Sequence, residues 1–344
     1  MGPMIHWANA GAYTLTPIAE TGARFCNFAP YVASINNDGV VAFQAALSAG
    51  GAGVFTGCGG SIATVADTTG GFYFGFYSHP DINRDGVVSV YAETAPGHQG
   101  VFLIRDGRTT HVANTRGPLQ AIGPLGPTVN DAGVVAFRAD TKTGGSGIFF
   151  GDGTALTCIA GTRERFTGFR GLPVVTRHGT IIFRADLKEG GHGIYASRGG
   201  APVTLVDTHH GFSELGAFPA CNDAETVVFS AMLSAGGAGI FAASGGAIVS
   251  VVGTEGPFES FRGALINQAD MVVFYATPRG GTLGIYAGPD PAVHRILGVG
   301  NPLFGSTVES FALNPVSLND AGQIAIRVQL ASGRQLILRA DPVA

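Results

Sequence analysis

One sequence motif recurs seven times along this 344-residue chain. It begins with Asn, or with Thr in the fourth unit, has a turn residue three positions later and ends in an apolar residue seven positions after its first residue. Its opening residues are Asn36, Asn83, Asn130, Thr176, Asn222, Asn267 and Asn319. They stand 47, 47, 46, 46, 45 and 52 residues apart, which suits one four-stranded propeller blade and is too short for a domain. The repeat predicts an all-β fold, a seven-bladed β-propeller forming one domain over residues 1–344.

Two further landmarks divide each unit into strands. A Gly stands seventeen residues after the opening residue of the first six units and begins a Gly-[Ile/Val]-[Phe/Tyr] strand, as in Gly147-Ile-Phe149. A Thr follows thirty-two residues after the opening residue in five units. In the third unit these landmarks separate four expected strands, over residues 127–129, 134–138, 147–150 and 156–160. Aromatic residues four positions after the landmark Thr, including Phe25 and Phe72, recur regularly, so we expect them to pack in the core.

The two ends of the chain complement each other. The seventh unit stops after its third strand, at Leu338, while residues 12–20 near the N-terminus match a fourth strand. We therefore expect this N-terminal strand to close the ring as the outermost member of the last blade. Pro17 agrees, because proline within a sheet is confined to edge strands. Residues before about Ala10 are then surplus, with His6-Trp7 as a strap or a tail.

Composition excludes several classes of function. Charged residues make up 13% of the chain and the formal net charge is −4, which argues against a nucleic-acid binder. No apolar run approaches the ~18 residues of a membrane span, and the first residues lack a signal peptide. We expect a soluble monomer as given. Four cysteines without metal-ligand spacing predict buried free thiols, and the histidines share no repeat position, so no metal centre is expected.

The repeat resembles the bacterial tandem-repeat family whose signature is written NxxGxxxF, often found on surface proteins with interchangeable C-terminal anchors. Full matches are Asn36, Gly39 and Phe43, and Asn130, Gly133 and Phe137. The resemblance implies the propeller fold and an extracellular or cell-surface origin; it implies no reaction. Residues 339–344 carry no sorting or membrane segment, which argues against anchoring of this chain.

A calcium loop is an alternative use of one turn. Asp81, Asn83 and Asp85 match the first half of a D-x-N-x-D-G loop, but the twelfth position, where a bidentate acid is needed, is Ala92. Because Asn83 is already required by the repeat, we expect no cofactor and keep calcium as the weaker alternative.

Residues that break the repeat are free for function, whereas those that follow it are scaffold. The breaks gather at the end of the second strand and in the connections between units. The candidate ligand-binding residues are Arg138, Asp140, Arg184, Asp186, Arg327, Arg165, Arg170, His209, His210, Tyr77 and His79. They predict a polar funnel for an anionic or hydroxylated ligand. The alternative is that Arg138/Asp140 and Arg184/Asp186 are local salt bridges of the rim.

Two functions from different classes remain open. The first is a non-catalytic binding or structural propeller that recognises a polysaccharide, peptide or protein partner through loops on one face. The second is a cofactor-independent lyase, hydrolase or cyclase-type isomerase with its site at the channel mouth; the sequence identifies no catalytic residue for it.

Overall fold

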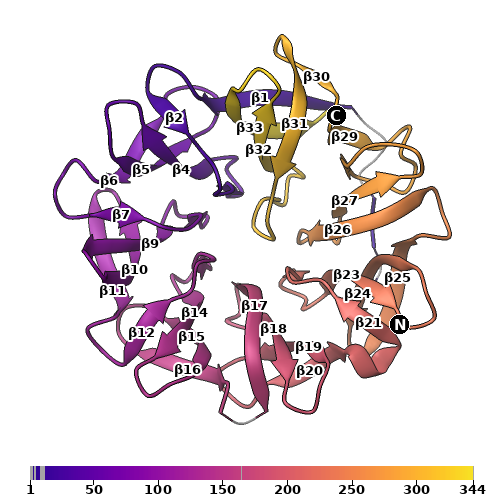
Figure 1. Cartoon of the computed structure of the whole chain (residues 1–344), viewed down its shortest axis with the longest axis horizontal. Helices are drawn as coiled ribbons and strands as arrows, with labels where there is room; N and C mark the ends of the chain where they lie inside the picture. Colours follow the sequence, from indigo (N-terminus) through magenta and orange to yellow (C-terminus); the bar gives the residue numbers. More distant parts are fainter. Residues whose placement is uncertain (1–2, 4, 8–11, 164, 344) are drawn as a thin grey trace.

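The computed structural model describes residues 3, 5–7, 12–163 and 165–343. Seven antiparallel sheets surround one axis (Figure 1), which confirms the predicted seven-bladed β-propeller. The one helical segment in these ranges is the short 3-10 helix η1 (Thr208–His210). None of the described helical structure is long and apolar enough to cross a bilayer.

Blades 1 to 6 follow the chain in order, and each begins with its innermost strand. Blade 1 contains β2 (Phe25–Asn27), β3 (Ser34–Ile35), β4 (Val41–Leu47), β5 (Ala52–Gly57) and β6 (Ala63–Asp67). Blade 2 contains β7 (Gly75–Phe76), β8 (Asp81–Ile82), β9 (Val88–Ala95), β10 (His98–Arg105) and β11 (Arg108–Asn114). Blade 3 contains β12 (Leu119–Ile122), β13 (Thr128–Val129), β14 (Val135–Thr141), β15 (Ser146–Gly151) and β16 (Leu156–Gly161).

The second half repeats this plan. Blade 4 contains β17 (Phe166–Val175), β18 (Ile181–Leu187), β19 (His192–Ser197) and β20 (Val203–Asp207). Blade 5 contains β21 (Phe212–Leu215), β22 (Ala220–Cys221), β23 (Val227–Leu233), β24 (Ala238–Ser244) and β25 (Ala247–Gly253). Blade 6 contains β26 (Phe258–Ile266), β27 (Val272–Pro278), β28 (Gly284–Tyr286) and β29 (Arg295–Gly298).

Blade 7 joins the two ends of the chain, as the sequence predicts. It contains β30 (Pro302–Leu303), β31 (Ser306–Ala312), β32 (Ile324–Leu330), β33 (Gln335–Pro342) and, outermost, β1 (Tyr13–Glu20). β1 runs antiparallel to β33, with Tyr13 opposite Pro342 and Pro17 opposite Leu338. Pro17 thus lies on an edge strand, which pairs with another strand on one side only, and this is where a sheet tolerates proline.

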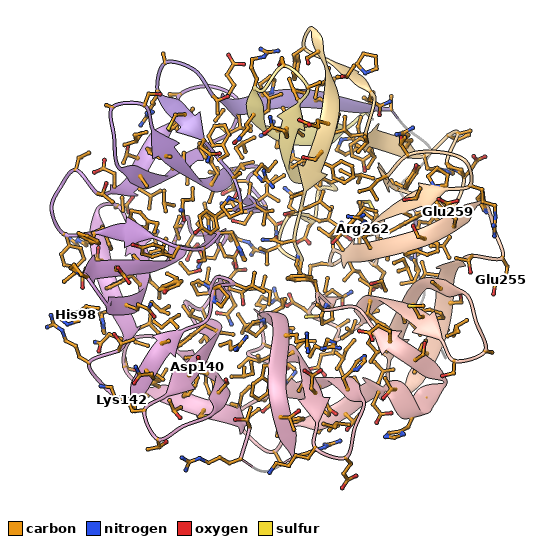
Figure 2. All side chains as sticks on the ribbon, viewed as in Figure 1. His98, Asp140, Lys142, Glu255, Glu259 and Arg262 are labelled. Atoms are coloured by element: carbon orange, nitrogen blue, oxygen red, sulfur yellow. The ribbon has the colours of Figure 1, made fainter. Side chains whose placement is uncertain are left out.

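The repeated Gly leaves room for the aromatic ring two residues after it. A Cβ on Gly53 would lie 2.7 Å from Cζ of Phe55, and one on Gly147 would lie 2.9 Å from Cε2 of Phe149. Each ring folds back over the glycine two residues before it and joins an aromatic cluster between blades; Phe55, for example, lies 4.9 Å from the ring of Phe25. Side chains fill the space between neighbouring blades (Figure 2), and the buried hydrophobic residues form separate clusters between blades.

The expectation for Phe72 is wrong. Its neighbour Tyr73 occupies the core position instead, with a ring 5.6 Å from Phe102 and 5.0 Å from Phe76. Phe72 is consequently 54% exposed. The first strand of blade 2 is displaced by one residue relative to the repeat, and this moves an aromatic side chain to the surface.

Of the strap or tail expected for His6 and Trp7, the structure shows contacts that agree with a strap: His6 forms a parallel bridge with Met271 and Trp7 packs on Phe274 with ring centroids 5.9 Å apart. The expectation for the cysteines needs correction. The four cysteines are free, but Cys26, Cys58 and Cys158 are exposed rather than buried.

Candidate functional site

The repeated Asn links each blade to the next. Its Oδ1 accepts the N–H of the residue four positions later, as from Val40 to Asn36 at 3.0 Å, and this closes the turn between the first and second strands. Its Nδ2 donates to the carbonyl of the corresponding residue in the following blade, as from Asn36 to Asn83 at 3.1 Å. The six donors are Asn36, Asn83, Asn130, Asn222, Asn267 and Asn319, at 2.9 to 3.3 Å. We call this ring the asparagine belt.

Thr176 interrupts the belt because it has no amide to donate to blade 5. A different contact spans the same interface: the Glu225 carboxylate accepts from the Thr180 hydroxyl at 2.7 Å and pairs with Arg198 at 2.7 Å. Glu225 stands where most units have Gly, and it keeps the left-handed conformation, with φ of 60°. Asp270 does the same in blade 6, with φ of 57°, and accepts from Asn222 at 2.7 Å. These acids keep a backbone conformation that favours glycine and use it to bridge blades.

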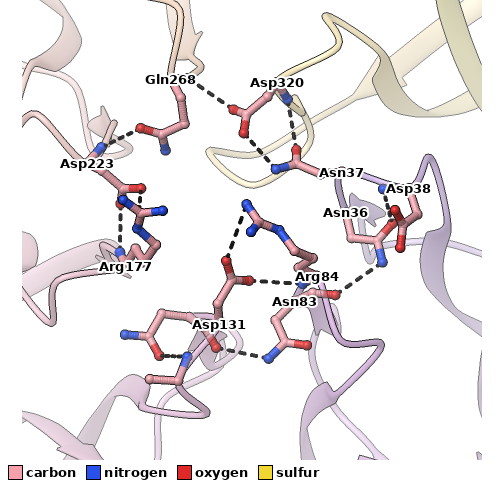
Figure 3. A network of polar contacts seen from close by, with 12 residues as sticks. Asn36, Asn37, Asp38, Asn83, Arg84, Asp131, Arg177, Asp223, Gln268 and Asp320 are labelled. Atoms are coloured by element: carbon pink, nitrogen blue, oxygen red, sulfur yellow. Dashed lines mark hydrogen bonds and ion pairs between the residues drawn. The ribbon is translucent and has the colours of Figure 1, made fainter.

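A cavity of about 390 Å³ lies on the axis beside the belt and is lined by residues of all seven blades. Its polar rim consists of the residue that follows each opening residue of the repeat (Figure 3). We call these residues the rim ring. Its members are Asn37, Arg84, Asp131, Arg177, Asp223, Gln268 and Asp320.

Five rim-ring side chains obey one rule: a side-chain oxygen accepts the backbone N–H of the rim residue in the preceding blade. Asn37 accepts from Asp320 at 3.0 Å, Asp131 from Arg84 at 3.0 Å, Asp223 from Arg177 at 2.7 Å, Gln268 from Asp223 at 2.8 Å and Asp320 from Gln268 at 3.1 Å. Since Asn, Asp and Gln all carry an acceptor oxygen, they are interchangeable in this role. These five rim residues therefore differ in type but share one structural role.

Arg84 and Arg177 break that rule, because guanidinium has no acceptor. The backbone N–H groups of Asn37 and Asp131, which precede them in the ring, have no hydrogen-bond partner within the described ranges. Each arginine side chain is about half exposed and lies near the next carboxylate, Arg84 at 3.8 Å from Asp131 and Arg177 at 3.6 Å from Asp223. Figure 3 shows the Arg84 guanidinium reaching toward the middle of the ring.

Asp81 and Cys221 contribute to the cavity wall below the rim. The Asp81 carboxylate accepts the N–H of Ile82 at 2.9 Å and that of Val129 in the next blade at 2.8 Å. Burial raises the pKa of Asp81 to about 7 even though both N–H groups favour the ionised form. Burial also raises the pKa of the Cys221 thiol, so this sulfur is a weak nucleophile.

The predicted strand-end residues occupy inter-blade contacts elsewhere in the ring. Arg184 is 3% exposed and donates to the Leu215 carbonyl of blade 5 at 3.2 Å. It also pairs with Asp186 at 3.0 Å and Glu214 at 3.5 Å. Arg170 adds a second contact to Asp186 at 2.9 Å. All three nitrogens of the Arg184 guanidinium therefore have protein partners.

Arg138 and Arg327 are less completely paired. Arg138 lies 3.9 Å from Asp140, and its Nε is buried without a partner in the described structure. The Nε of Arg327 is likewise buried without a described partner, and burial lowers its pKa with no carboxylate contributing. Neither residue belongs to the lining of the axial cavity.

The remaining candidates are dispersed over blades 2, 4 and 5. Arg165 lies over the Tyr195 ring, and His210 pairs with Asp207 at 2.8 Å beside His209 in η1. Tyr77 donates to Glu93 at 3.3 Å. His79 is buried, and burial lowers its pKa to about 4.

Sequence reasoning missed one histidine of this region. His192 accepts the Leu215 N–H on Nε2 at 2.8 Å, and burial lowers its pKa, so it is held neutral. Gln99 and Gln335, which occupy the same repeat position, accept backbone N–H groups of their next blades in the same way. The signal available in the sequence was that all three residues at this repeat position carry a side-chain hydrogen-bond acceptor.

The three candidate calcium ligands are directed to different partners. Asp81 and Asn83 serve the inter-blade bonds, whereas Asp85 lies on the surface 4.0 Å from Arg105. Within the described ranges, no group of three His, Cys, Asp or Glu residues is placed to hold a metal ion.

Solved propellers have the same fold at low sequence identity. Oligogalacturonate lyase in complex with manganese matches with a TM-score of 0.62, at 10% identity, over 97% of this chain and 98% of that one. The β-propeller domain of the Trilobed protease from Pyrococcus furiosus, described as an open velcro topology, gives 0.58 at 11% identity over 94% and 97%. A puromycin-hydrolysing peptidase of Mycobacterium tuberculosis gives 0.59 at 13% identity over 96% and 54%.

These likenesses establish the fold alone. In sequence, no curated protein matches the chain. A family model does match, over residues 35–334, and its span covers all seven opening residues of the repeat. The chain therefore belongs to the family described as a family of unknown function, DUF7453.

Proposed function

We propose that this protein is a non-catalytic binding propeller, and that its axial cavity receives an acidic group of a polysaccharide, peptide or protein partner. The observation that carries the proposal is the pair of arginines that break the rim ring. Each break forgoes a backbone hydrogen bond that the other rim positions make. A guanidinium at the axis is the feature gained in exchange.

The chemistry of each break suits an oxyanion. Arginine presents planar N–H donors that match carboxylate, sulfate or phosphate. Next to Arg84 the unpaired Asn37 N–H offers a further donor, and next to Arg177 the Asp131 N–H offers another. An anionic oxygen at the place that a rim carboxylate occupies elsewhere would accept from both the backbone and the guanidinium.

The carboxylates of the rim do not oppose this assignment. Asp131, Asp223 and Asp320 each accept a backbone N–H, so part of their charge is already compensated. The ion pairs to Arg84 and Arg177 are long and half exposed, which makes them weak and easily exchanged for a ligand. An acidic group that also carries hydroxyl donors would satisfy both signs of charge around the cavity.

This site lies at the turns between the first and second strands, the face opposite the connections that the sequence favoured. The setting we propose is extracellular or cell-surface, which the resemblance of Asn36, Gly39 and Phe43 to the NxxGxxxF repeats supports.

An enzyme remains the second candidate because of Asp81. A carboxyl with a pKa near 7 at a cavity wall has the property of a general acid or base. However, both of its oxygens accept backbone N–H groups and the residue is 4% exposed, which favours a structural role. The enzyme would be favoured if the wild-type protein cleaves a polysaccharide and Asp81→Asn loses that cleavage while its oxyanion binding is unchanged.

Titration calorimetry with sodium sulfate and sodium phosphate, at constant ionic strength against sodium chloride, tests the binding proposal. We expect saturable heats for wild type and loss of binding by tenfold or more in Arg84→Asn and Arg177→Asn. Arg108→Asn is the matched control, since Arg108 is exposed and is not part of the cavity lining. Equal binding by all four proteins would refute the axial site.

A further inference from the structure

We infer that blade 2 carries a second binding site, built around Phe72, for an acidic sugar residue of the hexuronate type. The site is a pocket of about 480 Å³ on the face of the ring opposite the axial cavity. Its walls come from the end of the second strand, the start of the third, the end of the fourth and the segment that leads into the first. Those segments meet on the face away from the turns that form the rim ring.

The aromatic wall of the pocket follows from the displacement of the first strand. In the other blades the residue at the position of Phe72 is buried, with exposures of 0 to 8%. Tyr73 takes that place here, and Phe72 is left at the surface. Its ring is still fixed, edge to face on Tyr73 at 4.7 Å and 6.2 Å from Phe102. A rigid aromatic face of this kind binds the apolar C–H face of a pyranose at little entropic cost.

The polar wall of the pocket is cationic. Arg116 and His98 contact each other at 3.1 Å, and Asn114 contacts His111 at 2.8 Å. The described lining contains neither Asp nor Glu, and Arg116 has no ion-pair partner within the described ranges. Lys142 of blade 3 adds a second cation at the edge, with Nζ 3.4 Å from the Arg116 carbonyl oxygen. His98 and Lys142 both lie toward the outer margin of the ring (Figure 2).

Together these walls specify the ligand class. An aromatic face next to hydrogen-bonding groups selects a ring with hydroxyls, and a guanidinium without an ion-pair partner among the described residues selects a carboxylate on that ring. A neutral sugar would leave Arg116 without a counter-charge, and a simple carboxylate would leave Phe72 without a partner.

Calorimetry with trigalacturonate, and with neutral trigalactoside as the comparison, tests this inference. The background is the double variant Arg84→Asn/Arg177→Asn, so that the axial cavity does not contribute. We expect saturable binding of trigalacturonate, at least tenfold weaker binding of the neutral sugar, and at least tenfold losses in both Phe72→Ala and Arg116→Ala.

Two control variants belong to the same blade. Phe74 is 58% exposed on the same segment but is absent from the pocket lining, and Arg108 is an exposed arginine outside it. Phe74→Ala and Arg108→Ala should bind like the background protein, with melting curves confirming that all variants fold. The inference is overturned if trigalacturonate does not bind, if both sugars bind equally, or if Phe74→Ala weakens binding as much as Phe72→Ala. Failure of the sulfate experiment at the axis would leave this result unaffected.

Discussion

Replacing Arg84 by asparagine separates the scaffold role of the rim ring from its proposed binding role. Asparagine is the residue that blade 1 uses at this position, and its Oδ1 there accepts a backbone N–H at 3.0 Å. Arg84→Asn therefore supplies an acceptor for the unpaired N–H of Asn37. Arg84→Ala removes the same guanidinium without supplying an acceptor, so the difference between the two variants isolates the restored bond.

The size of each effect follows from the kind of contact that is gained or lost. A net hydrogen bond contributes about 0.5–1.5 kcal/mol, so Arg84→Asn should be more stable than Arg84→Ala by that amount. Both variants lose the Arg84–Asp131 pair, which is 3.8 Å long and half exposed, at a cost of roughly 0–1 kcal/mol. Relative to wild type, Arg84→Asn should thus be equal or slightly more stable while binding sulfate at least tenfold more weakly.

Urea unfolding followed by circular dichroism measures these differences better than heating does. For 344 residues, at about 2.1 cal/mol/K per residue, 1 kcal/mol shifts the midpoint by only about 1.4 °C. The reasoning is refuted if Arg84→Asn is no more stable than Arg84→Ala, or if it binds sulfate as wild type does. The same pair of variants at Arg177 provides an independent repetition.

Three further predictions concern stability. Thr176→Asn should complete the asparagine belt and raise the free energy of unfolding by about 1 kcal/mol, whereas Thr176→Val should lower it; equal urea midpoints would contradict this. Burial lowers the pKa of His79 to about 4, so the part of the free energy of unfolding that depends on His79 falls as the pH falls from about 6.5. Burial raises the pKa of Asp81 to about 7, so the part that depends on Asp81 falls as the pH rises from about 4. Asp81→Asn should therefore leave stability that rises between pH 4.5 and 6.5, and His79→Gln stability that falls, each on the order of 3 kcal/mol at ~1.36 kcal/mol per pKa unit; slopes of the same sign would refute the assignment. Deleting residues 1–20 should destabilise the ring far more than deleting residues 1–9, because only the longer deletion exposes the edge of β33; equal losses on melting would count against it.

The ring and its closure are predictable from the sequence because a strict repeat imposes the same local geometry on each unit. Residues 12–20 complete the seventh unit by elimination, and the pairing of β1 with β33 agrees. The turn glycines are predictable for the same reason. Glu225 and Asp270 stand in place of two of these glycines; they keep the left-handed conformation and offset its cost through cross-blade bonds.

Contacts between units are what periodicity does not reveal. The sequence assigns the repeated Asn to a turn, which accounts for its Oδ1 but not for its Nδ2. Likewise, the rim ring varies from blade to blade and looks like free surface until the acceptor role of its oxygens is known. Only then do Arg84 and Arg177 stand out as exceptions. The one-residue displacement that exposes Phe72 in place of Tyr73 is equally invisible, because both residues are aromatic.

The asparagine belt has a direction. Each amide donates to the blade that follows it in the chain, so a donor already synthesised receives its acceptor when the next blade is completed. Assembly can therefore advance from the N-terminus one blade at a time, over separations of 45 to 52 residues, with the Glu225 bridge in place of the belt after Thr176. The exception is Asn319, whose acceptor in Asn36 lies 283 residues earlier. A nascent chain can thus hold a growing arc of blades together long before its two ends meet.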